Sequence, residues 1–381
     1  MKKSIYFWSP FINKVGTTKS TINSAISLSK FSKRYDVKII NVFGEWSKYS
    51  KIFKKNNIEK IDLTFNYYNF LPKTGFLFSR FSYLIIILLS IIPLIKLLKR
   101  NKPDVLIVHL ITSLPLILFN ILNLNTKLIL RISGFPKLNY FRKKLWSISE
   151  KNIYKITCPT KQLLDQLLNK KIFSENKLIF LPDPIIDINE FRKKINDKNF
   201  APQTDLNFDY FLSIGRFTKQ KNYLYLINEF EKFLKNFTEI KLLIIGEGEE
   251  KEKLKKIIKR KNLNNKILLL NKTENVFQYM KNAKAFILSS LWEGPGHVII
   301  EAALSNLFVI SSNCPNGPSE FLNYGKSGIL FQSNLSGELT KSLKYFIENE
   351  NILKKNRIYS KKNCLKYTKF RHYKIFEKIF Y

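Results

Sequence analysis

Residues 211–222 read FLSIGRFTKQKN, an apolar run that ends at a glycine and is followed by a basic loop. The run predicts a buried strand, and the residues after the loop predict a helix beginning near Asn222. Ligands of parallel α/β sheets bind beyond the carboxyl ends of the strands, where Gly215, Arg216 and Lys221 would stand. Arginine offers a planar fork to phosphate oxygens and lysine adds a mobile charge, so this edge suits an anion. The alternative is that both cations are simply solvated in a lysine-rich chain.

The alternation of strand and helix extends in both directions and predicts βαβ units around parallel sheets. In the first half we expect strands at 4–8, 37–42, 105–108, 127–131 and 156–158, and helices at 20–31, 81–99 and 139–151. In the second half we expect strands at 210–214, 241–245, 266–270, 285–288 and 308–311, and helices including 224–234 and 298–304. The chain has 381 residues, too many for one comfortable core, which favours two domains. The polar stretch from Pro184 to about Asp205 is the expected linker.

The overall charge is strongly positive, with 65 Lys and Arg against 29 Asp and Glu, a net charge of +36. Such a charge suits nucleic acid, an anionic membrane or a diphosphate, and the compositional bias of an AT-rich genome explains it equally well. The three cysteines, Cys158, Cys314 and Cys364, lie far apart without metal-ligand spacing and indicate a reducing, cytoplasmic setting. The apolar run at the amino terminus is too short for a signal peptide and predicts a first buried strand.

The most apolar stretch is residues 83–95, which falls short of the roughly 20 residues needed to cross a bilayer. Arg80 precedes it, and Lys96, Lys99 and Arg100 follow it. Two interpretations stay open: a helix that lies in the lipid interface with basic flanks, or a buried helix of the first domain. After residue 361 a basic, aromatic segment with helical spacing of its apolar residues predicts a docked helix rather than a solvated tail.

A second group of polar residues lies in 288–303, LSSLWEGPGHVIIEAA, where two carboxylates bracket a glycine-rich turn and the start of a helix. If Gly294 to Gly296 form the turn, Glu293 lies in the loop and Glu301 about one turn into the helix. Both carboxylates would then accept hydrogen bonds from sugar or ribose hydroxyls while the helix amides face phosphates. The alternatives are a pair of glycosidase carboxylates, disfavoured by the nearby basic edge, or two structural glutamates.

In chain order, Gly215-Arg216 with Lys221-Asn222, then Gly246-Glu247-Gly248, then Glu293-Gly294 through Glu301-Ala302 resemble the signature of retaining glycosyltransferase family 4. The similarity covers essentially the whole chain and is strong in the second half. It implies the α/β GT-B fold, two Rossmann-like domains with parallel sheets facing across a cleft and a C-terminal helix crossing back to the first domain. The implied domains are an acceptor-binding domain, 1–185, completed by about 362–381, and a nucleotide-sugar-binding domain, 186–361.

The resemblance also implies residue roles. Arg216 and Lys221 would hold the donor diphosphate, Glu293 the donor sugar and Glu301 the ribose. His109, which follows the strand 105–108, would contact the transferred sugar. The donor-binding set implied by the motifs also includes Gly16, Gly215, Gly246, Gly294, Gly296 and His297.

The chain departs from the family pattern at two places, and the second of them concerns the sugar pocket. Only Gly16, in residues 14–18 (KVGTT), matches the paired glycines that family members carry in the first strand–helix loop. Pro295 stands where the family usually has an aromatic residue. The segment 313–320, NCPNGPSE, matches a family loop near the donor.

The implied activity is a hexosyl transfer with retention from a nucleotide-diphosphate sugar, first of all UDP-linked, without metal or cofactor. The implied acceptor is a lipid-linked or polysaccharide glycan of the bacterial surface, at the inner face of the cytoplasmic membrane. Related epimerases and phosphorylases share the fold and remain alternatives. A nicotinamide enzyme would need a third glycine after Gly246-Glu247-Gly248, and no nucleic-acid-binding module is recognisable, so a nucleic-acid partner is not expected.

Overall fold

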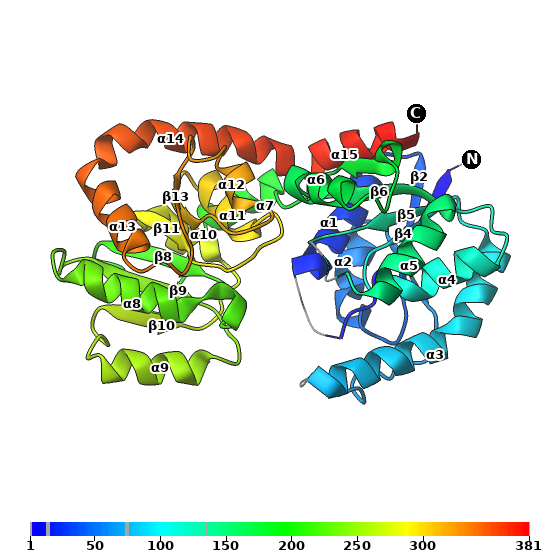
Figure 1. The fold of residues 1–381 in the computed structure, drawn as a ribbon, viewed down its shortest axis with the longest axis horizontal. Coiled ribbons are helices and arrows are strands. Elements are labelled where there is room, and N and C mark those ends of the chain that lie inside the picture. Colours follow the sequence, from blue (N-terminus) through cyan, green and yellow to red (C-terminus); the bar gives the residue numbers. More distant parts are fainter. Residues whose placement is uncertain (1, 13–15, 73–75, 135, 137, 381) are drawn as a thin grey trace. The chain divides into compact units, whose positions relative to one another are not determined.

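The computed structural model describes residues 2–12, 16–72, 76–134, 136 and 138–380, and the chain divides into two compact units. Unit 1 comprises Met1–Pro184 and Lys369–Tyr381, and unit 2 comprises Ile185–Thr368. Each unit is a parallel sheet covered by helices (Figure 1). The chain therefore passes between the units twice, after Pro184 and after Thr368.

The described part of unit 1 contains a seven-stranded parallel sheet in the order β3-β2-β1-β4-β5-β6-β7. Its strands are β1 (Lys3–Trp8), β2 (Tyr35–Asn41), β3 (Glu59–Asp62), β4 (Val105–Val108), β5 (Lys127–Arg131), β6 (Ile153–Cys158) and β7 (Leu178–Phe180). Its helices are α1 (Gly16–Phe31), α2 (Ser50–Lys55), α3 (Phe76–Asn101), α4 (Ser113–Ile121), α5 (Tyr140–Ser149), α6 (Lys161–Asn169) and α15 (Lys369–Glu377).

The described part of unit 2 contains a six-stranded parallel sheet in the order β10-β9-β8-β11-β12-β13. Its strands are β8 (Tyr210–Ile214), β9 (Lys241–Ile245), β10 (Ile267–Leu270), β11 (Ala285–Leu288), β12 (Phe308–Ser312) and β13 (Ile329–Phe331). Its helices are α7 (Ile188–Ile195), α8 (Tyr223–Leu234), α9 (Lys251–Arg260), α10 (Val276–Asn282), α11 (His297–Leu304), α12 (Pro318–Phe321), α13 (Glu338–Glu348) and α14 (Glu350–Asn363).

Both faces of each sheet are buried, and this explains why the central strands are continuous apolar runs. In β1, Ile5 and Phe7 belong to one core cluster of unit 1, while Tyr6 and Trp8 belong to the cluster on the other face. The strands of unit 2 divide their side chains between two clusters in the same way. The polar residues that follow these strands are therefore held at the edge of a rigid, doubly covered sheet.

The C-terminal helix α15 packs on α1 within unit 1, as the family resemblance implied. The rings of Phe31 and Phe370 meet edge to face with centroids 5.3 Å apart. The hydroxyl of Ser24 lies 2.8 Å from Nε2 of His372, and the Nδ1 of His372 lies 2.8 Å from the carbonyl oxygen of Pro182. The first domain is therefore built from both ends of the chain.

The polar stretch that we expected to be a linker contains helix α7 and belongs to unit 2. The carboxylate of Asp187 caps this helix by accepting hydrogen bonds from the backbone N–H groups of Asn189 and Glu190. The ring of Phe191 packs edge to face on Phe277 of α10, with centroids 5.1 Å apart. The linker prediction was wrong here because a short capped helix can be mostly polar when only one face is buried.

Helix α3 is longer than the apolar run suggested. It spans 26 residues, and Arg80–Asn101 is the one segment among the described residues that is long and apolar enough to cross a membrane, with mean hydropathy 2.5. Only 28% of that apolar segment is buried, so α3 packs into the core of unit 1 with one side and exposes much of the rest. The helix lies along the outside of unit 1 (Figure 1).

Candidate functional site

Each sheet reverses its strand order at one place, and the site residues predicted from the sequence follow the strands there. In unit 2 the order reverses between β8 and β11, and in unit 1 between β1 and β4. Connections that leave in opposite directions open a crevice at the carboxyl ends of such strands. Gly16 and His109 follow β1 and β4, and all the other predicted site residues belong to unit 2. Lys14 and Val15, quoted with Gly16, lie outside the described residues.

The loop after β8 folds back across the end of its own strand. A Cβ atom on Gly215 would lie 3.0 Å from Cε of Lys221 and 2.8 Å from the hydroxyl of Tyr223, so the lysine stem crosses directly over the glycine. Asn222 has a positive φ of 55°, which turns the chain into α8. The side chain of Arg216 is exposed and makes no ion pair with any residue that the structure describes. Both cations thus lie at the carboxyl edge of β8.

The glycines of Gly246-Glu247-Gly248 have a packing role. A Cβ atom on Gly246 would lie 1.9 Å from the carbonyl oxygen of Gly215, and one on Gly248 would lie 2.4 Å from that of Phe217. The absence of these side chains lets the loops after β8 and β9 touch, and the N–H of Phe217 donates to the carbonyl of Glu247 at 2.8 Å. The pair of glycines is therefore explained by packing without any ligand.

Lys221 and Glu293 form a nearly buried ion pair between the loops that follow β8 and β11. The ammonium of Lys221 lies 2.5 Å from Oε1 of Glu293, and the hydroxyl of Ser290 donates to the same oxygen at 2.6 Å. The other oxygen, Oε2, accepts no hydrogen bond from a residue that the structure describes. A carboxylate has about four acceptor positions, so Oε2 can accept a hydrogen bond from a ligand hydroxyl. Lys221 keeps further ammonium hydrogens for an anion.

Glu301 lies one turn into α11, as the glycine-rich turn predicted. Gly296 has a positive φ of 73° and ends the turn, so that α11 begins at His297. Glu301 is buried, and Gly294 approaches the loop 313–320 closely, because a Cβ on Gly317 would lie 2.2 Å from the Gly294 carbonyl oxygen. The helix thus directs its N-terminal amides towards the carboxyl edge of the sheet, where anions are stabilised.

The segment 313–320 also lies beside Glu293. The backbone N–H of Glu293 donates to the carbonyl oxygen of Pro315 at 3.1 Å. On the other side, the side-chain amide of Gln220 donates to the carbonyl of Trp292 at 2.7 Å. Glu293 is therefore held by its own backbone, by Ser290 and by Lys221, and its position is set before any ligand binds.

His109 lies at the carboxyl end of β4 and bridges α1 and β5 through its two ring nitrogens. Nδ1 lies 3.1 Å from the hydroxyl of Thr21, which itself donates to the carbonyl of Thr17, and Nε2 pairs with the hydroxyl of Ser133. Because the Thr21 hydroxyl already donates its hydrogen to Thr17, Nδ1 of His109 must be the donor to Thr21. Nε2 then carries no hydrogen and accepts from the hydroxyl of Ser133. Burial, with a smaller effect of Arg131, lowers the pKa of His109 to about 3. The ring is therefore neutral, and both of its nitrogens are paired with hydroxyl groups of unit 1.

Three polar residues that the sequence analysis missed support these groups. Arg131 forms a buried ion pair with Asp183, whose other oxygen accepts from the hydroxyl of Ser20 at 2.5 Å. Ser133 and Ser290 hold His109 and Glu293, respectively. A charged residue at the end of an apolar strand, as in residues 127–131, is a signal that could have found Arg131, because a buried guanidinium needs a carboxylate. The two serines carry no such signal.

The comparisons with known proteins all point to the same family. Residues 194–363 match the profile of the family described as glycosyl transferases group 1. An uncharacterised glycosyltransferase of Methanocaldococcus jannaschii is 31% identical over 338 residues, which is 80% of this chain and 78% of the relative. A Campylobacter jejuni protein is 27% identical over 237 residues, 60% of this chain and 62% of the relative; it is named as an N-acetylgalactosaminyltransferase acting on a saccharide linked to diphospho-undecaprenol.

The fold is shared with glycosyltransferases of known structure. The crystal structure of Anabaena HepE in complex with UDP superposes with a TM-score of 0.73 at 14% identity, covering 100% of this chain and 99% of HepE. At that identity the likeness concerns the fold alone, and together with the two parallel sheets it assigns the GT-B fold. On its likeness to the M. jannaschii protein over 80% of its length, and on the matching profile, the chain belongs to the glycosyl transferases group 1 family.

Proposed function

We propose that this protein transfers a hexose, with retention of configuration, from a UDP-linked donor to a lipid-linked or polysaccharide acceptor in the synthesis of a bacterial surface glycan. The relatives are named as transferases, which disfavours the epimerase and phosphorylase alternatives. The Campylobacter relative supports a lipid-diphosphate acceptor, and the UDP in HepE supports a uridine nucleotide. We propose that the reaction takes place at the inner face of the cytoplasmic membrane, without a resident metal or cofactor.

The observation that carries the proposal is the fixed pair of Lys221 and Glu293 at the carboxyl edge of β8 and β11. A diphosphate at this edge would meet Arg216 and Lys221, and the sugar attached to it would meet Oε2 of Glu293. Glu301 would bind the ribose from α11. Because the carboxylate is already oriented, binding of the donor costs little ordering of the protein.

The proposed reaction needs no nucleophile from the protein. The acceptor oxygen bonds to C1 of the donor sugar as the bond from C1 to the diphosphate oxygen breaks. The acceptor proton passes to the departing diphosphate, on the same face of the sugar. Arg216, Lys221 and the amides at the start of α11 would stabilise the charge that develops on the leaving group. His109, which is neutral, would contact the transferred sugar and could not supply a proton at neutral pH.

The test replaces the two cations one at a time. In Arg216→Ala and Lys221→Ala we expect kcat for sugar transfer to fall about 10²–10³-fold, the usual effect of losing one electrostatic contact to a transition state. The matched control is Lys219→Ala, because Lys219 is an exposed lysine in the same turn (Lys219–Lys221). Transfer that survives both substitutions at the wild-type rate would contradict the proposed donor site.

A further inference from the structure

Unit 1 contains a cavity of about 680 Å3 with one polar end and one apolar wall. The polar end lies at the carboxyl ends of β4 and β5 and includes His109 and Ser133. Thr17, the second residue of α1, also lines it, and its buried hydroxyl has no hydrogen-bond partner among the described residues. An unpaired buried hydroxyl at the polar end of a cavity is the kind of group that binds another hydroxyl-rich group.

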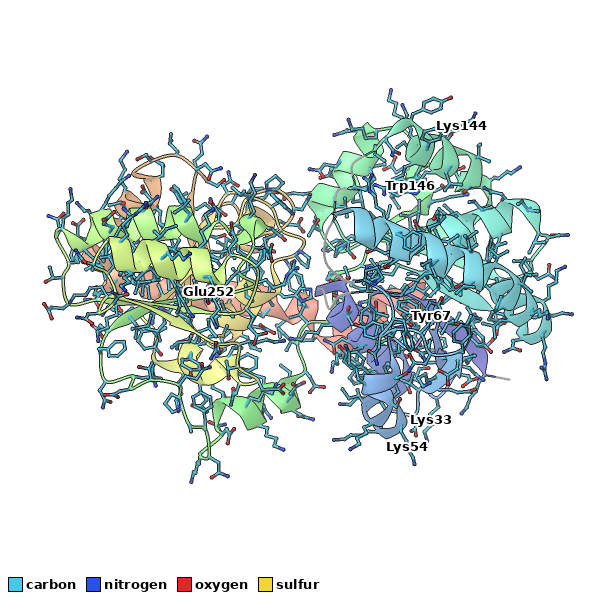
Figure 2. The ribbon with its side chains drawn as sticks, turned by 90° about the horizontal axis from the view of Figure 1, so that it is seen from below. Lys33, Lys54, Tyr67, Lys144, Trp146 and Glu252 are labelled. Atoms are coloured by element: carbon cyan, nitrogen blue, oxygen red, sulfur yellow. The ribbon has the colours of Figure 1, made fainter. Side chains whose placement is uncertain are left out.

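The apolar wall of the cavity is formed by α3 and α5. Tyr83 and Ile87 come from α3, and Leu145 and Trp146 come from α5. Arg142 lines the same cavity from the first turn of α5 and is exposed to solvent. Trp146 lies on the inner side of this helix, whereas Lys144 of the same helix points outward (Figure 2). The cavity therefore also offers a cation.

Helix α3 carries a second apolar face that points away from the protein. Leu84, Leu88 and Ile92 follow each other at intervals of four residues and are 52%, 59% and 64% exposed. On the opposite side, Ile86 and Leu94 are completely buried in the core of unit 1. A helix anchored in this way cannot leave the protein to cross a bilayer, so the exposed stripe can only lie along a surface.

Basic residues surround this stripe. Arg80 stands at its start, and Lys96, Lys99 and Arg100 follow it on the same helix. Helix α4, which packs beside α3, carries two further exposed apolar residues, Ile117 and Ile121. An apolar stripe with basic flanks is complementary to a bilayer that contains anionic lipids, because the hydrocarbon covers the stripe and the headgroups pair with the cations.

The cavity and the stripe share one helix. Tyr83 and Ile87 line the cavity, and their neighbours Leu84 and Leu88 belong to the outward stripe. We propose that the two together bind an anionic amphiphilic acceptor delivered from an anionic bilayer. Its phosphate pairs with Arg142, its saccharide meets His109, Ser133 and Thr17, and its hydrocarbon leaves past Tyr83 and Ile87 into the lipid. This inference rests on the transferase function proposed above, and it selects the lipid-linked acceptor over the polysaccharide.

The first experiment measures binding of farnesyl diphosphate, a water-soluble prenyl diphosphate, by the change in tryptophan fluorescence. We expect a saturable change that disappears in Trp146→Phe, because Trp146 is the reporter in the cavity wall. In Arg142→Ala we expect about tenfold weaker binding, and in Lys143→Ala, an exposed neighbour that does not line the cavity, unchanged binding. Equal affinity for inorganic pyrophosphate would overturn the claim that the ligand is an amphiphile. Wild-type affinity in Arg142→Ala would overturn the role of Arg142.

The second experiment is flotation of the full chain with vesicles of phosphatidylcholine containing phosphatidylglycerol. We expect Leu88→Glu with Ile92→Glu to reduce the floated fraction about tenfold, and the matched control Ile352→Glu, at an isoleucine 71% exposed on α14 of unit 2, to float like the wild type. Far-UV circular dichroism and the UDP-induced rise in Tm serve as folding controls. Flotation of the double variant at the wild-type level would overturn the proposed surface.

The two proposals fail in different ways. A wild-type protein that binds farnesyl diphosphate and floats, yet shows no change in Tm with UDP, would refute the transferase proposal and leave the cavity assignment standing. A protein stabilised by UDP that neither floats nor binds the prenyl diphosphate would refute the acceptor proposal alone.

Discussion

His372 and Glu45 are buried in unit 1 and respond to acid in opposite ways. Burial, with a smaller effect of Arg131, lowers the pKa of His372 to about 4. Burial raises the pKa of Glu45 to about 7, although two backbone N–H groups that donate to its carboxylate act to lower it. Below about pH 6.5 the unfolded chain protonates its histidine and the folded chain does not, so His372 costs stability as pH falls. Between pH 7 and 4.5 the folded chain protonates Glu45 first, so Glu45 adds stability as pH falls.

The two variants should therefore change the pH dependence of unit 1 in opposite directions. Between pH 7 and pH 5, the free energy of unfolding of His372→Gln should fall by about 2 kcal/mol less than that of the wild type. That of Glu45→Gln should fall by about 2 kcal/mol more. Urea denaturation at the two pH values measures both. Parallel pH dependence in the wild type and His372→Gln would show that folding does not lower the pKa of this histidine.

Gly246 provides a test of packing at one residue. A methyl group there would lie 1.9 Å from the carbonyl oxygen of Gly215, so Gly246→Ala must shift the backbone of the loop after β8. We expect a loss of about 1–3 kcal/mol in the free energy of unfolding of unit 2. Gly134→Ala is the control, since nothing lies within 4 Å of the added methyl group. Equal stability of the two variants in urea titrations would contradict this account.

The sequence identified the residues at the carboxyl edge of unit 2 but not the bonds between them. Glycines and charges after apolar strands mark that edge, which is why Lys221 and Glu293 could be singled out. Their direct contact depends on the adjacency of β8 and β11, which are far apart in the chain. Ser290 could not be identified, because a serine after a strand has many uses and only the fold shows which oxygen its hydroxyl meets.

At the scale of elements, most strands were predictable, but three of the edge strands, β3, β7 and β13, were not. β4, β5, β8, β9 and β11 begin and end at the predicted residues, because a strand covered on both faces is a continuous apolar run. β3, β7 and β13 contain three or four residues each, which is too few to show a clear pattern. Their pairing is set by the neighbouring strand rather than by their own composition.

Helix α15 should contribute strongly to the stability of unit 1. Phe376 is buried against Tyr35, with ring centroids 6.5 Å apart, in the core cluster on that face of the sheet. We expect Phe376→Ala to lower the free energy of unfolding of unit 1 by about 3–5 kcal/mol. Phe370→Ala, at a ring that is half exposed on the same helix, should cost clearly less. Denaturation followed by circular dichroism measures both, and equal losses would contradict the packing described for α15.

At the scale of the whole molecule, binding of UDP should first stabilise unit 2. At a UDP concentration of 100 times Kd, a ligand that binds only the folded state adds about 2.7 kcal/mol of stability. Hydrogen exchange should therefore slow in the backbone around 215–222 and 293–301. Protection confined to residues of unit 1 would contradict the proposed donor site.

The composition of unit 1 from two distant segments has a consequence for biosynthesis. Residues 1–184 leave the ribosome first, but α15, which completes this unit, is translated only after all of unit 2. Unit 2 is one continuous segment and can reach its native state while synthesis continues. Until α15 has been made, the face of α1 that will receive Phe370 and Tyr373 is uncovered. Translation that stalls before codon 369 would leave a protein with one finished half and one exposed, aggregation-prone half.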